Sequence, residues 1–194
     1  MNIKSAVKEN ATELAYLLNL AGEGIPKYLW SEIAENGQDP MDVGRMRALR
    51  EEGGFSYKNA RIYIENGSLQ GMIVSYKQPD QHSLESIEEY PKVVKPLVLL
   101  EAEAPGTWYV NAIATFEKYR GKGIAQKLLR EAEERAVSTG TYTMSLIVAS
   151  ENIRAKSLYE YIGYRFVSSL PVVLYPGCMH GGEWLLMVKE LVNA

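Results

Sequence analysis

The sequence is poor in the residue types that build disulfide frameworks and in the long apolar runs that cross membranes. Its one cysteine, Cys178, cannot form an internal disulfide, which suits a reducing compartment. The longest apolar runs, such as Pro96 to Leu100, are far shorter than the roughly 20 residues of a membrane helix. Residues 1–10 carry charges where a signal peptide would need an apolar stretch. We therefore expect a cytoplasmic protein with no membrane partner.

Neither sign of charge dominates the sequence, and histidine is scarce. Lys and Arg number 21 against 24 Asp and Glu, a net charge of -3, so no general field draws the chain onto nucleic acid. The two histidines are His82 and His180. Cys178 and His180 precede Glu183, but these three mixed residues lack the paired spacing of a zinc site. We expect neither a nucleic-acid partner nor a metal.

No repeat, low-complexity tract or Pro/Gly/Ser-rich linker divides the sequence, which predicts a single domain over residues 1–194. Its first third indicates helices. A periodic apolar face favours a helix over Ala11–Leu20. Pro26 suits the first turn of a second helix that reaches Ile33, because that position needs no amide donor. A third helix is predicted over Asp39–Glu51.

A β-hairpin and a polar connection follow these helices. Alternation over Ala60–Glu65, the turn pair Asn66-Gly67 and the apolar run Met72–Tyr76 predict two antiparallel strands. The segment Lys77–Gly106 is rich in carboxylates and prolines. We expect it to form a loop with a short helix over one end of the sheet.

Strands and helices alternate in the second half of the chain. Strand, helix and strand in that order imply a crossover connection and a parallel pair, whereas the hairpin adds antiparallel strands. The predicted fold class is therefore α/β, with a central mixed sheet flanked by helices. The expected strands are Trp108–Thr115, Tyr142–Val148, Tyr164–Ser168 and Trp184–Val188, and the expected helices are Gly123–Ser138 and Ile153–Ile162.

The segment Tyr119–Ala125 lies between a predicted strand and an amphipathic helix. A glycine-bearing turn at a helix start presents unpaired backbone amides and the positive end of the helix dipole. Gly121 and Gly123 also let a ligand approach the backbone closely, so the segment predicts a pyrophosphate site. A Rossmann loop would need glycine where Gln126 stands, and a Walker loop would need Ser or Thr where Gly123 stands. Neither nucleotide-binding loop fits.

A second patterned segment, Asn152–Tyr164, reads Asn-x-x-Ala-x-x-Leu-Tyr-x-x-x-Gly-Tyr. Ala155, Leu158 and Ile162 share one helical face. Gly163 is placed to end this helix in a left-handed cap.

In this order, Arg120-x-x-Gly123-x-Ala125 and Asn152–Tyr164 resemble two motifs of the GNAT superfamily of N-acetyltransferases. The resemblance covers about Lys58–Leu191. It implies a GNAT-like fold in which two parallel strands of the mixed sheet splay apart. It further implies acetyl-CoA as acyl donor, with its pyrophosphate on the glycine-bearing loop.

The resemblance also implies roles for individual residues. The pantetheine arm would pair with the strand before the loop, where a backbone amide can stabilise an oxyanion. Tyr159 falls at the general-acid position of the family, and a phenol with a pKa of about 10 can pass a proton to a thiolate with a pKa near 8.5. Asn152 either caps its helix or contacts the cofactor. The implied cofactor-binding residues are Ile113, Ala114, Thr115, Arg120, Gly121, Lys122, Gly123, Ile124, Ala125 and Asn152.

The group that removes the amine proton stays open at this point. Glu101 and Glu103 precede the central strand, and Glu23 comes from the helical N-terminal region. A chain of water molecules could equally take the proton.

The resemblance implies an enzyme that acetylates a primary amine of a small molecule or peptide by direct attack, through a tetrahedral intermediate. The alternative is a non-catalytic acyl-CoA-binding or regulatory domain with the same fold. A homodimer is compatible with either. Neither the acceptor amine nor the preferred acyl chain can be derived from the sequence.

Overall fold

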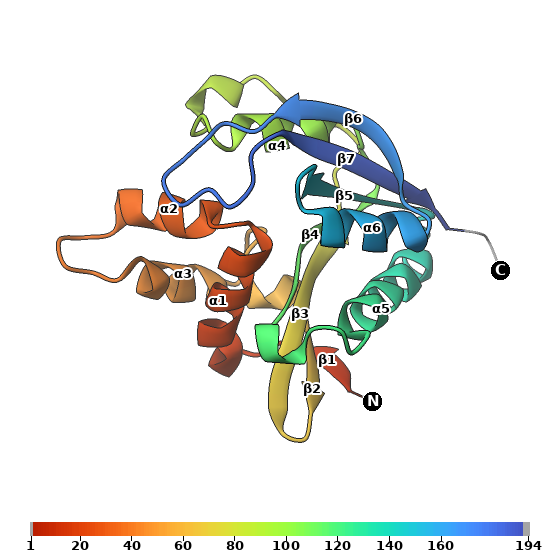
Figure 1. Cartoon of the computed structure of the whole chain (residues 1–194), viewed down its shortest axis with the longest axis horizontal. Coiled ribbons are helices and arrows are strands. Elements are labelled where there is room, and N and C mark those ends of the chain that lie inside the picture. The colour runs from red at the N-terminus through yellow and green to blue at the C-terminus, as the bar shows by residue number, and fades with distance from the viewer. Residues whose placement is uncertain (1, 192–194) are drawn as a thin grey trace. The chain divides into compact units, whose positions relative to one another are not determined.

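A computed structural model describes residues 2–191 of the chain (Figure 1). These residues divide into two compact units, each made of two stretches of chain. Unit 1 comprises residues 2–75 and 111–132, and unit 2 comprises residues 76–110 and 133–191. Strand β4 (Trp108–Thr115) and helix α5 (Ile124–Ser138) each contribute residues to both units.

The predicted mixed sheet is confirmed. Within residues 2–191, seven strands follow one another in the order β1-β2-β3-β4-β5-β7-β6. The pairs β1–β2, β2–β3, β5–β7 and β6–β7 are antiparallel, whereas β4 and β5 pair in parallel. Besides β4, the strands are β1 (Ile3–Ser5), β2 (Ala60–Glu65), β3 (Ser68–Lys77), β5 (Thr143–Ala149), β6 (Arg165–Pro171) and β7 (Glu183–Glu190).

Strands β2 and β3 of unit 1 form the predicted hairpin. Asn66 with φ 52° and Gly67 with φ 73° both lie in the left-handed region, as a type I′ turn requires. Strand β3 begins at Ser68, earlier than the predicted Met72, because its first residues continue the pairing directly after the turn. The short strand Ile3–Ser5, which pairs with β2, was not predicted.

The three N-terminal helices of unit 1 pack against one another (Figure 1). They are α1 (Ala11–Ala21), α2 (Ile25–Ile33) and α3 (Pro40–Ala48). Asp39 caps α3, since its carboxylate accepts a hydrogen bond from the amide of Met41 at 2.9 Å. Helix α3 ends before the predicted Glu51. Trp30 of α2 is buried and faces Gly44 of α3.

Strand β5 organises unit 2. Its residues Met144–Leu146 pair in parallel with Trp108–Val110 of β4, and its whole length pairs antiparallel with β7. Strand β6 pairs with β7 and has a bulge between Phe166 and Ser168. The hydrophobic core of this unit includes Leu186 of β7, which is fully buried.

Two helices of unit 2 pack against its strands. Helix α4 (Lys95–Ala102) contacts β5, β6 and β7, and helix α6 (Ile153–Tyr161) contacts β5. The predicted loop with a short helix before β4 is thus found, with a further single turn η3 at Ile87–Glu89. No helix in residues 2–191 has both the length and the apolar character needed to cross a membrane.

Candidate functional site

The glycine-bearing loop lies in unit 1, between the end of β4 and the start of α5. Gly121 with φ 80° and Gly123 with φ 74° are both left-handed, a conformation that a residue with a side chain rarely adopts. The first hydrogen bond of α5 runs from the amide of Lys127 to the carbonyl of Gly123 at 3.1 Å. The amides before Lys127 therefore precede the helical ladder and point out from its positive end.

Open space lies in front of this loop. A Cβ built on Gly121 would meet no described atom within 4 Å, and one on Gly123 would only reach the side-chain oxygen of Gln126 at 4.0 Å. Residues 120–123 are exposed, whereas Ile124 is buried and anchors the helix. Exposed amides at a helix start, with no side chain over them, can bind an anion such as a pyrophosphate.

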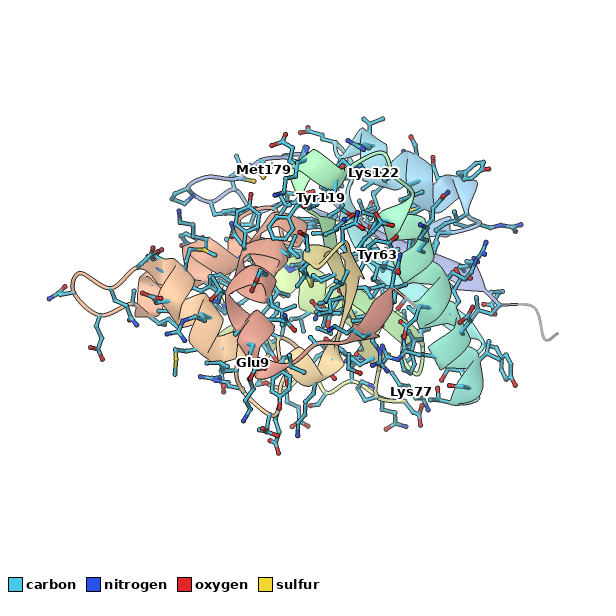
Figure 2. The ribbon with its side chains drawn as sticks, turned by 90° about the horizontal axis from the view of Figure 1, so that it is seen from below. Glu9, Tyr63, Lys77, Tyr119, Lys122 and Met179 are labelled. Atoms are coloured by element: carbon cyan, nitrogen blue, oxygen red, sulfur yellow. The ribbon has the colours of Figure 1, made fainter. Side chains whose placement is uncertain are left out.

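Two lysine side chains lie over the ring of Tyr119, which directly precedes the glycine-bearing loop. Lys118 Nζ and Lys122 Nζ lie 5.0 and 5.2 Å from the centroid of the Tyr119 ring, and Figure 2 shows Tyr119 and Lys122 together. Arg120 Nη1 is 3.9 Å from Glu117 Oε1, a long ion pair at the surface. Lys122 is thus held over a ring. The sequence pattern assigned no role to Lys118 or to the Tyr119 ring, because the motif that carries the resemblance begins at Arg120.

The last residues of β4 lead into this loop. Ala112 and Ala114 are buried, whereas Ile113 and Thr115 are half-buried. A Cβ on Gly71 of β3 would lie 2.9 Å from the carbonyl oxygen of Ala114, closer than real Cβ contacts allow. Gly71 therefore permits the close approach of backbone to Ala114, and sequence reasoning missed it because the contact joins distant segments.

Asn152 and Tyr159 belong to unit 2. The side-chain oxygen of Asn152 accepts a hydrogen bond from the amide of Ala155 at 3.2 Å, so this residue caps α6. Tyr159 is 8% exposed, whereas Tyr161 is 81% exposed. These two tyrosines therefore face different sides of the helix.

The buried ring of Tyr164 packs against Tyr159, and a half-buried ion pair lies next to Tyr164. The rings of Tyr159 and Tyr164 meet edge to face, with centroids 5.8 Å apart, and the amide of Tyr164 donates to the carbonyl of Tyr159 at 2.9 Å. Lys189 Nζ lies 6.0 Å from the Tyr164 ring and 2.6 Å from Glu133 Oε1. Burial, followed by the charge of Glu133, raises the pKa of Tyr164 well above its usual value. The sequence pattern did not reveal this group, because Glu133 of α5 and Lys189 of β7 are distant in the sequence from Tyr164, which directly precedes β6.

The three carboxylates considered as bases have different environments. Glu103 follows α4 and is exposed. Glu101, within α4, is half-buried and interacts with the Tyr109 hydroxyl. Glu23 is 5% exposed and has φ 54°, an unusual backbone conformation for a residue other than glycine. Among residues 2–191, no group of three or more His, Cys, Asp or Glu side chains could hold a metal ion.

The predicted site residues thus fall into two groups. Unit 1 holds the end of β4 and the whole loop, residues 113–115 and 120–125, and unit 2 holds Asn152 and Tyr159.

Comparison with known proteins connects these features to one family. The model of the acetyltransferase (GNAT) family matches residues 26–164. The uncharacterized N-acetyltransferase YdgE of Bacillus subtilis (strain 168) is 36% identical over 56 residues, which make up 29% of this chain. The match spans 36% of that relative's length.

Solved structures share the fold across almost the whole chain. One acetyltransferase crystal structure has a TM-score of 0.67 at 22% identity and covers 98% of this chain and 99% of its own. The polyamine N-acetyltransferase of Drosophila melanogaster, which forms N-acetylagmatine, has a TM-score of 0.69 at 12% identity, with 97% and 99% covered. An N-acetyltransferase of Staphylococcus aureus Mu50 has a TM-score of 0.61 at 21% identity, with 96% and 98% covered. Because the family model matches residues 26–164, most of this chain, the chain belongs to the GNAT family of acetyltransferases.

Proposed function

We propose that this chain transfers the acetyl group of acetyl-CoA to a primary amine of a small molecule or peptide. The observation that carries the proposal is the loop of exposed amides at the start of α5, in which both glycines are left-handed. Such a loop suits the diphosphate of CoA, and family membership makes acetyl transfer the matching chemistry.

In this proposal the pyrophosphate of acetyl-CoA binds the amides of residues 121–125. Arg120 and Lys122 supply positive charge beside them. The pantetheine arm pairs with the backbone of residues 113–115. Asn152 serves mainly as the cap of α6, and its role toward the cofactor is secondary. No metal takes part.

The amine nitrogen attacks the thioester carbonyl directly and forms a tetrahedral intermediate, whose oxyanion a backbone amide of β4 stabilises. The C–S bond then breaks, and the hydroxyl of Tyr159 donates its proton to the leaving sulfur. The burial of Tyr159 and its packing on Tyr164 support this role, because a fixed ring keeps the hydroxyl in one place.

Cationic amines are the acceptor class that we propose to test first. A fold-related enzyme acetylates agmatine, and the segment before β4 in this chain is acidic. We further propose that the chain works as one catalytic domain of the cytoplasm, either alone or as a homodimer, without nucleic-acid or membrane partners.

The test is release of free CoA thiol from acetyl-CoA with a panel of agmatine, putrescine, spermidine and a lysine-containing peptide. Amine-dependent thiol release, with the acetylated amine identified by mass spectrometry, would support the proposal. Binding of acetyl-CoA without turnover of any amine would favour the non-catalytic acyl-CoA-binding domain instead.

A further inference from the structure

A carboxylate, two tyrosines and a buried amide side chain gather in unit 2, beside the beginning of β4. Glu101 of α4 interacts with the hydroxyl of Tyr109, which is itself buried. Tyr76 of β3 meets Tyr109 edge to face, with ring centroids 6.1 Å apart. The backbone amide of Gln78 donates to the carbonyl of Thr107 at 2.8 Å and ties the end of β3 to the start of β4, while the buried side chain of Gln78 interacts with Glu101. The cluster thus joins α4 to both strands.

The position of Tyr109 along β4 relates this cluster to the residues of the proposed site. Side chains alternate along a strand, so Tyr109 shares a face with Asn111, Ile113 and Thr115. These three are the half-buried positions of β4, and the residues between them are buried. Strand β4 itself contains no Asp or Glu. A carboxylate that serves an amine next to β4 must therefore come from another element, and Glu101 is placed beside Tyr109.

We propose that Glu101 accepts the proton that the amine loses during acetyl transfer, with Tyr109 holding the carboxylate in place. This role rests on the proposed acetyltransferase function and completes its proton balance. Glu101 is then a catalytic residue, and Tyr109 is a positioning residue.

The proton balance of the step is simple. The amine nitrogen forms a bond to the carbonyl carbon and gives one proton to the Glu101 carboxylate. The bond from the carbonyl carbon to sulfur breaks, and the sulfur takes a proton from Tyr159. Glu101 then releases its proton to solvent, from which Tyr159 is reprotonated. The products are the amide and free CoA thiol.

The electrostatic setting of Glu101 suits a base. Burial raises the pKa of its carboxyl above the usual value, and the hydrogen bonds from Tyr109 and Gln78 act in the opposite direction. A carboxylate with a raised pKa holds a proton more strongly, which makes it a better acceptor near neutral pH. Burial, then the charge of Glu101, raises the pKa of Tyr109 well above the usual value, so its hydroxyl stays a donor.

The other ionisable side chains on the elements that pack against α4 are paired with other residues or exposed. Strand β5 contains no ionisable side chain. On β7, Lys189 is bound to Glu133. On η3, Glu88 pairs with Lys95 at the first turn of α4, while Glu101 lies in its last turn. The remaining ionisable residues of η3, β6 and β7 are exposed, namely Glu89, Arg165, Glu183 and Glu190.

The decisive experiment measures kcat against pH, between pH 5.5 and 9.5, with acetyl-CoA and the best amine of the panel. Glu101→Gln keeps the size and a hydrogen-bond acceptor but removes the base, so kcat should fall roughly 10²-fold or more. The fall of kcat toward acid that reports Glu101 should disappear. The amine titrates identically in every variant, so its own contribution cancels in the comparison.

Tyr109→Phe gives an independent readout that does not require loss of activity. It removes a hydrogen bond that favours the charged carboxylate, so the pKa of Glu101 should rise. The acid-side fall of kcat should then move to higher pH. An unmoved profile in a folded Tyr109→Phe enzyme would overturn the positioning role.

Glu103→Gln is the matched control, because this exposed carboxylate lies two residues further along the chain. It should retain the wild-type rate and pH profile. A Glu101→Gln enzyme with wild-type kcat and pH profile would overturn the role of Glu101 alone. A Glu23→Gln enzyme that shows the loss of kcat expected of Glu101→Gln would do the same. A wild-type protein that acetylates no amine would instead remove the proposed function and this role together.

Discussion

Tyr159 and Tyr161 lie two positions apart on α6, and the helix turns them to different sides. Tyr159 packs its ring against Tyr164, and the backbone of Tyr164 donates back to Tyr159. Lys189, which forms an ion pair with Glu133, lies over the Tyr164 ring. A phenol supported in this way loses little further freedom when it donates a proton, whereas the exposed ring of Tyr161 stays free to rotate in water.

Tyr159→Phe should lower kcat by roughly 10²- to 10⁴-fold, the usual contribution of a positioned acid. The substitution keeps the ring and its edge-to-face contact with Tyr164, so folding and the affinity for CoA should be preserved. Steady-state kinetics, thermal unfolding and CoA titration of the purified variant check all three expectations.

Tyr161→Phe controls for the loss of a hydroxyl from the same helix. Its ring is mostly in solvent, and the rate should stay within about twofold of the wild type. A wild-type rate in Tyr159→Phe would mean that the thiolate leaves unprotonated or takes its proton from water. An equal loss in both variants would exclude a specific role for Tyr159.

At the scale of elements, two glycines are required for different physical reasons. Gly123 combines a left-handed backbone with open space, which exposes the amides at the start of α5. Gly44 lies inside α3, where a Cβ would come within 2.3 to 2.6 Å of three ring atoms of Trp30. The first glycine leaves the backbone open to the proposed ligand, and the second allows two helices to pack closely.

Gly123→Val should weaken CoA binding at least tenfold, because a branched side chain would cover the amides that the pyrophosphate needs. Isothermal titration with CoA measures the effect. Gly140→Val is the matched control, since Gly140 is also left-handed, with φ 76°, has open space and follows the far end of α5. Both variants should lose some stability from backbone strain. Unchanged CoA affinity in a folded Gly123→Val protein would contradict the assignment of this loop.

Gly44→Ala should lower the free energy of unfolding by about 1 to 3 kcal/mol, even though alanine favours helices more than glycine does. The added methyl group cannot fit unless the buried ring of Trp30 moves. Urea unfolding measures the change. Met46→Ala, at a half-exposed position of the same helix, should change stability by less than about 0.5 kcal/mol. A Gly44→Ala protein as stable as the wild type would show that α2 and α3 can separate without cost.

At the scale of the whole molecule, the sequence predicted those turns and helix ends that depend only on neighbouring residues. Asn66-Gly67 predicted its hairpin turn and Gly163 its left-handed cap, with φ 101°, because both depend on the conformation of one or two residues. The mixed sheet followed from the order of strands and helices. The three-residue strand Ile3–Ser5 is too short to show an alternating pattern.

Features that depend on distant segments could not be read from the sequence in the same way. The need for Gly71 becomes visible only with the carbonyl of Ala114 beside it. Glu101 and Glu103 are nearly equivalent in the sequence, and only the neighbours brought by folding leave the first half-buried and the second exposed. Sequence reasoning therefore placed the loop and the tyrosine on their elements but left the base open among several carboxylates.

The proposed function also predicts a property of the whole folded chain, since a ligand that binds only the native state stabilises it. CoA at about 100 times its dissociation constant should add about 2.7 kcal/mol to the free energy of unfolding. For a chain of this size, each kcal/mol corresponds to roughly 2 to 4 °C, so the melting temperature should rise by about 5 to 10 °C. Differential scanning fluorimetry with CoA, acetyl-CoA and ATP tests this.

ATP at the same concentration should have a smaller effect, because the loop lacks the residues of both nucleotide-binding patterns. Gly123→Val should melt at nearly the same temperature with and without CoA. A larger shift with ATP than with CoA would contradict acetyl-CoA as the substrate and favour a nucleotide-binding role instead.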